Sequence, residues 1–302
     1  MSKEKVNAHE KNYGNTIVND LRDYLWGNGR SDSTIDNYCR TAIQFLEFAG
    51  ITTKDEMMTL TKIVVRNFVE HMKKNMYEIN KIYTAETINN KIAGLNQLLG
   101  LYKLDNLKEK ALYCHRKVFL KDSEILTDDD VSRILKESKI SNHILYLAVR
   151  SMAQMGIRVS EIQFITVESL NKGYIVVFNK GGMRKVPLPP DLINELREYC
   201  NVRGITKGII ISVKKDTAIN RTTIGRFMKK LAGKLGIDIK KAHPHSLRHN
   251  FAIRYLNRYG EGAISRLADI LGHRSVETTR IYLRDTLTNA ANSLTAKNLK
   301  IK

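Results

Sequence analysis

Cysteine is scarce in this chain of 302 residues, which contains only Cys39, Cys114 and Cys200. The three are widely separated and fit neither a disulfide framework nor the spacing of zinc ligands, so we interpret them as reduced thiols of a cytosolic protein. Long apolar runs are also missing: no stretch approaches roughly 18 uninterrupted apolar residues, the length typical of a membrane span. The polar segment 1–15 lacks the apolar core of a signal peptide. The sequence therefore predicts neither a membrane span nor a secretion signal.

Acidic residues are outnumbered, with 31 Asp and Glu against 50 Lys and Arg, for a formal net charge of +19. The excess is uneven. Residues 1–125 carry 19 basic and 16 acidic side chains, whereas residues 126–302 carry 31 and 15, a net charge of +16. A surplus concentrated in one half is expected of a surface that neutralises phosphates. Charge alone leaves a merely soluble basic protein, or an RNA binder, as alternatives.

The first third of the chain has the periodicity of helices. Apolar residues recur at helical spacing over residues 16–26, from Ile35 to Leu46, near 61–75 and over 84–101. The first helix is predicted to stop at Gly27-Asn28-Gly29, and Ser33 or Thr34 is predicted to cap the second. No strand pattern interrupts these segments. We predict a compact helical domain that occupies residues 1–104.

The rest of the chain mixes helices with a little sheet. Residues 105–125 combine weak periodicity with many cations and are predicted to be a linker. Thr127 and Asp130 then predict a capping box at the start of a helical run to about residue 156. Residues 174–178 and 185–188 predict a hairpin around Lys180-Gly181-Gly182, with a further short strand over 208–213. The predicted fold class is mainly α with a small β-sheet (α+β), with a second domain over residues 126–302.

Taken one by one, the polar residues of the second domain have ordinary explanations. Arg158, which follows Met155-Gly156-Ile157, fits a surface or salt-bridged arginine. The segment 243–249, His-Pro-His-Ser-Leu-Arg-His, fits a helix start with solvated charges. Leu271-Gly272-His273 fits a helix C-terminus with Gly272 as the residue that ends it, and Tyr282 fits a packed tyrosine.

Their order along the chain carries more information. Arg158-Val159-Ser160-Glu161 is followed by a hairpin lysine, by His245-x-x-Arg248, by Leu271-Gly272-His273 and, nine residues later, by Tyr282. This succession resembles the tyrosine recombinase (phage integrase) family over the whole C-terminal half, and RVSEI, HSLRHNFA and LGHRSVETTRIY match the family's wording. The resemblance implies a tyrosine recombinase catalytic domain. The helical N-terminal domain resembles the family's SAM-like core-binding domain in pattern only.

Phosphate chemistry and the resemblance together assign roles to these residues. The transition state of phosphoryl transfer spreads negative charge over the non-bridging oxygens, and arginines offer forked, permanently charged donors. Arg158 and Arg248 are therefore the expected phosphate clamp, with His273 as a further donor. Tyr282 is the expected nucleophile. His245, one helical turn before Arg248, is expected to accept the proton of the phenol or to position it.

The departing 5′ oxygen needs a proton, and the resemblance implies that a lysine on the hairpin turn supplies it. Lys180 is favoured because it stands immediately before the glycines, where the family's lysine stands. The turn is slightly shorter than the common pattern, and Lys185 is the alternative. Glu161 is expected to orient an active-site side chain, although its position also fits a helix-surface acid. His249 is expected to support the segment around it without being catalytic.

The resemblance also implies the mechanism and the partners. Tyr282 would attack the scissile phosphate, leaving a 3′-phosphotyrosine and a free 5′ hydroxyl, and the 5′ hydroxyl of a partner strand would reverse the step. No cofactor is expected, neither ATP nor metal, and the sequence agrees, since it has no Walker loop and no evident carboxylate cluster. The expected partners are double-stranded DNA recombination sites. A homotetramer would act on two sites through a Holliday junction; an accessory directionality factor is left open, and no membrane partner is expected.

Three alternatives use parts of the same pattern. A type IB topoisomerase or a telomere resolvase shares the phosphotyrosine chemistry, but the compact length and the short spacing from His273 to Tyr282 favour a simple recombinase. A non-catalytic DNA-binding protein has no reason to keep these residues in order. A zinc hydrolase could use His245 and His249, but Ser246 stands where a zinc protease motif has its glutamate.

The biological role is less sharply defined. We expect a Xer-like recombinase without an arm-binding domain, because no small extra domain precedes the helical region. Integration and excision, or resolution, of a mobile element is favoured over the resolution of dimers. The enzyme is expected to be cytoplasmic and nucleoid-associated.

Overall fold

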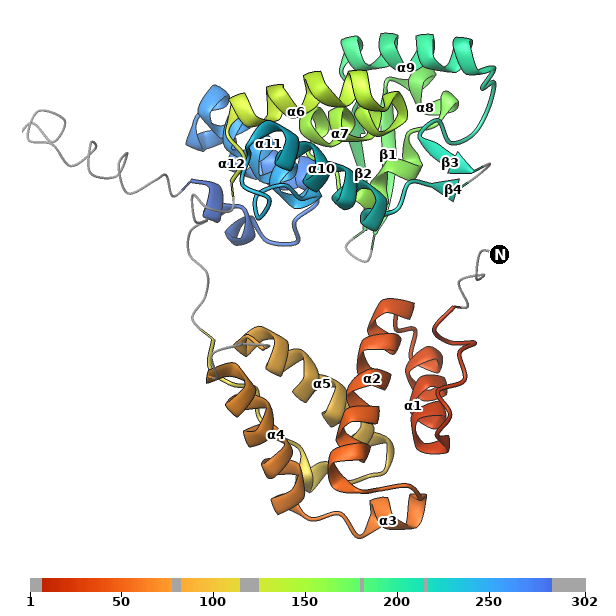
Figure 1. Cartoon of the computed structure of the whole chain (residues 1–302), viewed down its shortest axis with the longest axis vertical. Coiled ribbons are helices and arrows are strands. Elements are labelled where there is room, and N and C mark those ends of the chain that lie inside the picture. The colour runs from red at the N-terminus through yellow and green to blue at the C-terminus, as the bar shows by residue number, and fades with distance from the viewer. Residues whose placement is uncertain (1–6, 78–82, 115–124, 180–181, 215–216, 284–302) are drawn as a thin grey trace, which may run out of the picture. The chain divides into compact units, whose positions relative to one another are not determined.

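The computed structural model describes residues 7–77, 83–114, 125–179, 182–214 and 217–283. Two compact units divide the chain, Met1–Arg116 and Lys117–Lys302 (Figure 1). Each unit has a hydrophobic core of its own. The domain limits at residues 104 and 126 stay a prediction, since residues 115–124 lie outside the described ranges.

Helices packed around one core form unit 1. The four helices predicted from periodicity are α1 (Thr16–Gly27), α2 (Asp32–Ala49), α4 (Lys62–Tyr77) and α5 (Ala85–Leu101). α2 packs against both α1 and α5, as Figure 1 shows. Each of these two neighbours turns an apolar stripe towards the core. The fully buried side chains include Leu21, Ile35, Phe45, Ile88 and Leu95.

Two details of unit 1 differ from the sequence prediction. A further helix, α3 (Lys54–Met58), has only five residues, too few for apolar periodicity to reveal. Its capping box joins Thr53 and Glu56. The predicted cap of α2 is wrong: the helix begins at Asp32, so Ser31 occupies the N-cap position and makes no side-chain cap bond.

The first part of the predicted linker lies against α5. Asn89 exchanges two hydrogen bonds with the backbone of Leu112, at 2.9 and 2.7 Å. The side chain of Asn96 likewise exchanges two hydrogen bonds with the backbone of Glu109, at 2.8 and 3.0 Å. The turn η1 (Asp105–Leu107) buries its last side chain in the core of unit 1. Residues 105–112 are therefore held by unit 1.

A central helix organises unit 2. α6 (Asp128–Ser141) begins with the predicted capping box of Thr127 and Asp130. The next helix, α7 (His143–Met155), buries most of its side chains and contacts α6, α10 (Arg221–Leu235) and α11 (Pro244–Tyr259). A helix buried on so many sides must be apolar nearly all round. α7 ends at Gly156, whose φ of +63° is the left-handed conformation that favours glycine.

The predicted hairpin is confirmed. β1 (Tyr174–Asn179) and β2 (Gly182–Pro187) pair antiparallel, with Val176 opposite Lys185. The strand predicted over 208–213 is displaced: a second small pair joins β3 (Ser212–Lys214) to β4 (Thr217–Ala218).

The other helices of unit 2 surround α7 and the hairpin. α8 (Val167–Lys172) packs against β1 and against α9 (Pro190–Arg203), as Figure 1 shows, whereas α12 (Ile264–Leu271) packs against β2. The fold class predicted from the sequence, mainly α with a small β-sheet, is confirmed. In the parts of the chain that the structure describes, no helix has both the length and the apolar character to cross a membrane. The remaining elements are η3 (Val159–Phe164), η4 (Glu261–Ala263), η5 (Val276–Thr278) and η6 (Arg280–Tyr282).

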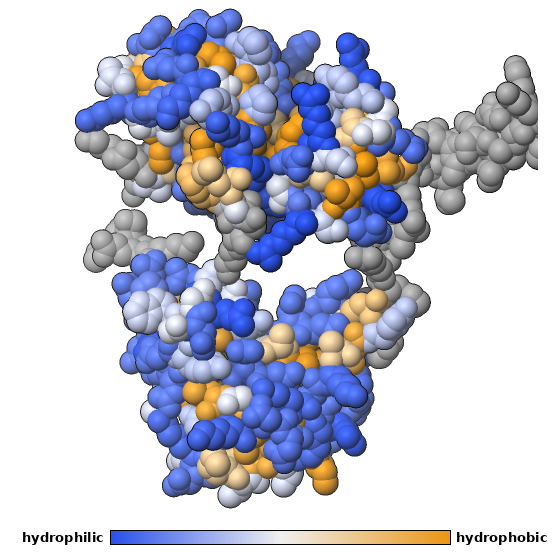
Figure 2. Space-filling view, turned by 180° about the vertical axis from the view of Figure 1, so that it is seen from behind, coloured by the Kyte–Doolittle hydropathy of each residue, from blue (hydrophilic) through white to orange (hydrophobic). Residues whose placement is uncertain are grey.

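Apolar side chains gather inside the two units. On the face seen in Figure 2, hydrophilic residues predominate and hydrophobic ones form smaller patches. Isolated exposed apolar residues, such as Trp26 in unit 1 and Phe178 on the hairpin, are ordinary for a folded protein.

Gly156 is expected to be essential for the packing of unit 2. A Cβ at this position would lie 2.3 Å from Cδ1 of Phe251, in addition to the strain of positive φ. Gly156→Ala should therefore lower the free energy of unfolding by about 1–3 kcal/mol more than a glycine-to-alanine change that adds only the strain of a positive φ. Urea denaturation of the two variants measures the difference. Gly173→Ala is the matched control, because Gly173 has φ +73° and nothing within 4 Å of its would-be Cβ. Equal losses would contradict the packing of Phe251 on Gly156.

Candidate active site

Arg248 is the most deeply buried arginine of the site. It lies on α11 and is only 2% exposed. Its guanidinium donates from Nη1 to the carbonyl oxygen of Gly156, at 2.8 Å, and from Nη2 to that of Leu271, at 2.5 Å. These carbonyls stand at the C-terminal ends of α7 and α12, where the helix dipole favours a cation. Arg248 therefore lies where two helices end.

Arg158 reaches the same place from the turn after α7. Its Nη1 donates to Oε1 of Glu161, at 3.0 Å, and to the carbonyl oxygen of Leu271, at 3.4 Å. Oε2 of Glu161 accepts the backbone N–H of Arg158, at 2.9 Å, and Nη2 of Arg184, at 2.8 Å. Glu161 is only 3% exposed, so it is not a surface acid. The local sequence Arg-Val-Ser-Glu thus folds into one turn, in which Glu161 binds both the backbone and the side chain of Arg158.

Positive charge is in excess at this cluster. Among the described residues, Glu161 is the one carboxylate that forms an ion pair with Arg158, Arg184 or Arg248. Burial, and then the charge of Arg158, lowers the pKa of Arg248 to about 10. Burial by itself raises the pKa of Glu161, but hydrogen bonds from Arg184 and from the Arg158 backbone outweigh it and leave that pKa below its usual value. Such a cluster suits an anionic ligand.

His273 follows Gly272, which ends α12 with φ +66°, as the sequence predicts. Its Nδ1 lies 2.8 Å from Oγ1 of the fully buried Thr279. Burial, followed by the charges of Arg248 and Arg158, lowers the pKa of His273 to about 4. The imidazole is therefore neutral near pH 7. When the Thr279 hydroxyl donates to Nδ1, the proton of the ring resides on Nε2, which can donate to a ligand.

Tyr282 ends the turn η6 and is 8% exposed. Its phenol oxygen lies 3.0 Å from Nδ1 of His249, within hydrogen-bonding distance, and the ring of His273 stacks against it with centroids 6.4 Å apart. His245 stacks on His249, with centroids 5.9 Å apart. Burial raises the pKa of Tyr282, and the nearby arginines partly offset this. Of the two histidines one turn apart on α11, His249 is the one that contacts the phenol.

Among the described residues, the structure brings together all of those singled out in the sequence except Lys185. Lys180, the favoured proton donor, lies outside the described residues. Lys185, the alternative, is an exposed residue of β2 whose Nζ lies 4.8 Å from the ring centroid of Tyr174. The residues that meet are Arg158, Glu161, His245, Arg248, His249, His273 and Tyr282.

A cleft of about 570 Å³ opens beside this cluster. Arg158, His273 and Arg274 line it together with the rings of Phe164 and Phe178. No group of three or more His, Cys, Asp or Glu side chains that could hold a metal ion occurs within the described ranges.

Comparison with known proteins assigns the family. The profile of the phage integrase family matches residues 124–288, and that of the N-terminal SAM-like domain of phage integrases matches residues 18–101. The chain belongs to the phage integrase family. It is 27% identical to tyrosine recombinase XerA of Pyrococcus furiosus over 96% of both chains. It is 26% identical to tyrosine recombinase XerD of Shewanella oneidensis, over 88% of this chain and 91% of that protein.

Solved structures of other proteins have the same fold. The XerH recombinase bound to its difH substrate before cleavage matches with a TM-score of 0.66 and 18% identity, over 92% of this chain and 84% of that one. A lambda integrase tetramer bound to a Holliday junction matches with a TM-score of 0.66 and 16% identity, over 90% and 78%. The predictions of the family, of its two domain types and of a tyrosine recombinase that cleaves and rejoins DNA are confirmed.

Sequence reasoning about this integrase missed two residues of the cluster. Arg184 binds Glu161 from β2, and Thr279 binds His273 from the turn before Tyr282. Thr279 stands inside the quoted motif LGHRSVETTRIY, so its position was a usable signal. Arg184 stands in the predicted hairpin, four residues after Lys180, but only the tertiary structure shows its partner.

The neutral state of His273 predicts a pH dependence of stability. In the unfolded chain a histidine binds a proton below pH 6.5 or so, whereas folded His273 does so only near its pKa of about 4. The free energy of unfolding should therefore fall as the pH drops from 6.5 towards 4, because protonation favours the unfolded state. Urea denaturation at a series of pH values should show a smaller fall in His273→Gln.

His71→Gln, at an exposed position of unit 1, is the matched control and should leave the fall unchanged. A pH dependence identical in His273→Gln and in the wild type would contradict a neutral, buried His273.

Proposed function

We propose that unit 2 of this recombinase forms its covalent link to DNA through Tyr282, which bonds to the 3′ phosphate of the cleaved strand. One observation carries the assignment: the buried phenol of Tyr282 feels the positive charges of Arg248 and Arg158, and among the described residues only Glu161 forms ion pairs with this arginine cluster. A phosphodiester supplies the missing negative charge. The basic excess of residues 126–302 supports contacts to further phosphates of the duplex.

The proposed cleavage step balances as follows. The Tyr282 oxygen bonds to phosphorus, the bond from phosphorus to the 5′ oxygen breaks, and Lys180 gives that oxygen a proton. Arg158 and Arg248 hold the non-bridging oxygens, on which charge grows, and neutral His273 donates from Nε2. A 5′ hydroxyl then reverses the step. Because only 8% of Tyr282 is exposed, attack requires η6 to move towards the DNA.

The proton of the phenol goes to the histidines of α11. Burial, followed by the charge of Arg221, lowers the pKa of His245, so its imidazole is neutral near pH 7 and can accept a proton. We assign proton acceptance to His245. His249 supports it by holding the phenol at 3.0 Å.

The proposed assembly is a homotetramer on two double-stranded DNA sites, which exchanges strands in pairs through a Holliday junction. The shared fold of the lambda integrase tetramer on such a junction supports it. We also propose that an accessory protein sets the direction of recombination. The proposed setting is the cytoplasm, at the nucleoid, and the proposed role is integration and excision, or resolution, of a mobile element.

Covalent trapping tests the proposal. The purified protein is incubated, in chelator, with nicked DNA fragments that span the ends of its own genetic element, and adducts are separated on a denaturing gel. The wild type should form a protein–DNA adduct. Tyr282→Phe should form none, because only the nucleophilic oxygen is lost, while its affinity for the DNA stays the same.

Tyr259→Phe, at an exposed tyrosine of α11, is the matched control and should form the adduct at the wild-type rate. A persistent adduct in Tyr282→Phe would refute the assignment of the nucleophile. Specific binding without any wild-type adduct would point instead to a DNA-binding role.

Replacing the leaving oxygen by sulfur tests the proton donor. Lys180→Ala should slow cleavage of the ordinary substrate by about 10² or more, the usual contribution of a general acid. A substrate with sulfur at the 5′ position should restore the rate, because a thiolate leaves without a proton. Lys185→Ala serves as the comparison, and rescue of that variant instead would move the role to Lys185.

A further inference from the structure

Arg184 connects three parts of unit 2 that lie far apart in the sequence. From β2 its Nε donates to the carbonyl oxygen of Ile270, at 2.9 Å, and its Nη2 donates to Oε2 of Glu161, at 2.8 Å. The side chain is 11% exposed. One rigid, forked cation thus joins the hairpin to the last turn of α12 and to the turn that carries Arg158.

The remaining nitrogen of the Arg184 guanidinium, Nη1, packs against Gly272. A Cβ at Gly272 would lie 2.6 Å from Nη1 of Arg184 and 2.9 Å from its Cζ, so the guanidinium occupies the space that any other residue would need. Nη1 is buried and finds no hydrogen-bond partner among the described residues. Leaving a buried donor without a partner is costly, and this cost is offset by the ion pair with Glu161. The Arg184 guanidinium is therefore held in contact with Gly272, the residue that precedes His273.

Resting on the proposed function, we infer that Arg184 is a positioning residue for DNA cleavage. It touches no substrate. Through Glu161 it sets the direction of the Arg158 guanidinium, and through Ile270 and Gly272 it sets the position of His273. Two groups that hold the phosphate thus depend on one side chain of the hairpin.

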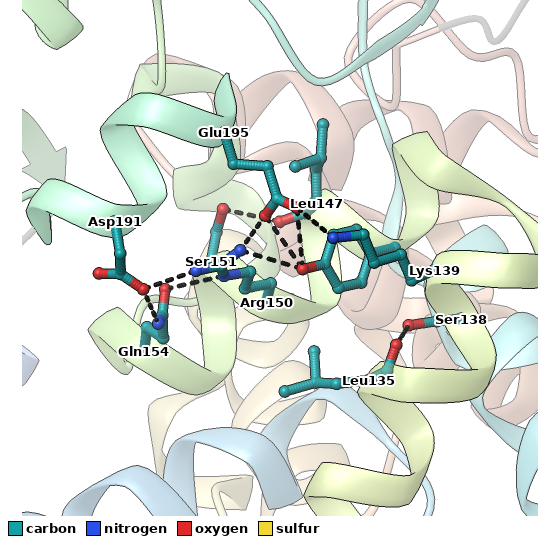
Figure 3. A network of polar contacts seen from close by, with 10 residues as sticks. Leu135, Ser138, Lys139, Leu147, Arg150, Ser151, Gln154, Asp191 and Glu195 are labelled. Carbon is teal, nitrogen blue, oxygen red and sulfur yellow. Dashed lines mark hydrogen bonds and ion pairs between the residues drawn. The ribbon is translucent and has the colours of Figure 1, made fainter. Parts of the chain in front are cut away.

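A second buried arginine of unit 2 provides a comparison. Arg150 on α7 forms ion pairs with Glu195 and with Asp191, the latter at 2.5 Å, and bonds Tyr146 at 3.0 Å (Figure 3). This network joins α7 to α9 and contains none of the residues of the active site. Arg150 is 17% exposed, against 11% for Arg184, so the two arginines are similar in burial, and both form ion pairs.

The test compares Arg184→Met with Arg150→Met on the nicked substrate of the trapping experiment. Cleavage rates are measured at saturating protein, below the unfolding temperature of each variant, and DNA affinities are measured separately. Arg184→Met should lower the cleavage rate by about 10²-fold, the effect of misplacing catalytic groups by about 1 Å, with affinity unchanged. Arg150→Met should lower thermal stability and leave the cleavage rate at the wild-type value.

A double-mutant cycle with Glu161→Gln shows whether Arg184 acts through the carboxylate. The double variant should cleave no more slowly than the slower single variant, because both changes break the same link. A scissile methylphosphonate, which carries one charge less, adds a readout that a structural role would not move. On it, the deficit of Arg184→Met should shrink, as should that of Arg158→Lys.

A wild-type cleavage rate in Arg184→Met would overturn the inference, and so would losses that multiply in the double variant. Either result can be told apart from failure of the proposed function, in which the wild type itself forms no adduct.

Discussion

The burial of one guanidinium organises unit 2. Arg248 is almost completely removed from water, and its bonds run to the carbonyl oxygens of Gly156 and Leu271. An arginine can be buried at this point because two helices, α7 and α12, end there. The last carbonyl groups of a helix have no hydrogen-bond partner within the helix, and they carry the negative end of the helix dipole. Both helices end at a glycine with positive φ. The chain therefore needs two left-handed glycines in order to hold one buried arginine.

This arrangement determines the chemistry around it. Arg158 and Arg184 share Glu161, and within the described part of the chain Arg248 bonds only to neutral carbonyl oxygens, so the cluster keeps a surplus of positive charge. Burial, together with that surplus, lowers the pKa of His273 to about 4 and keeps its ring neutral. It also partly offsets the rise that burial causes in the pKa of Tyr282. A cationic pocket with neutral histidines and a protonated phenol is suited to bind a phosphodiester before any proton moves.

Local signals predicted most of the fold. The helices of unit 1, the capping box of Thr127 and the glycine that ends α12 each depend on residues close together in the sequence, and the structure contains all of them. Prediction failed where the signal was short or ambiguous. α3 has too few residues for periodicity, and neighbouring serine and threonine residues could equally cap α2. The ordered motif from Arg158 to Tyr282 found most of the site, because each of its parts is itself local.

The sequence by itself determined the family, the helical and hairpin elements and the set of residues to which we assign the reaction. The tertiary structure alone decided which of them touch. Arg184 meets Glu161 and Ile270, which are 23 and 86 residues away, and the phenol of Tyr282 meets His249 and not His245, although both histidines lie one turn apart on α11. Such contacts depend on how helices and strands pack, to within an ångström. Periodicity and motif order fix which face or turn a residue occupies, but not the partner that packing brings to it.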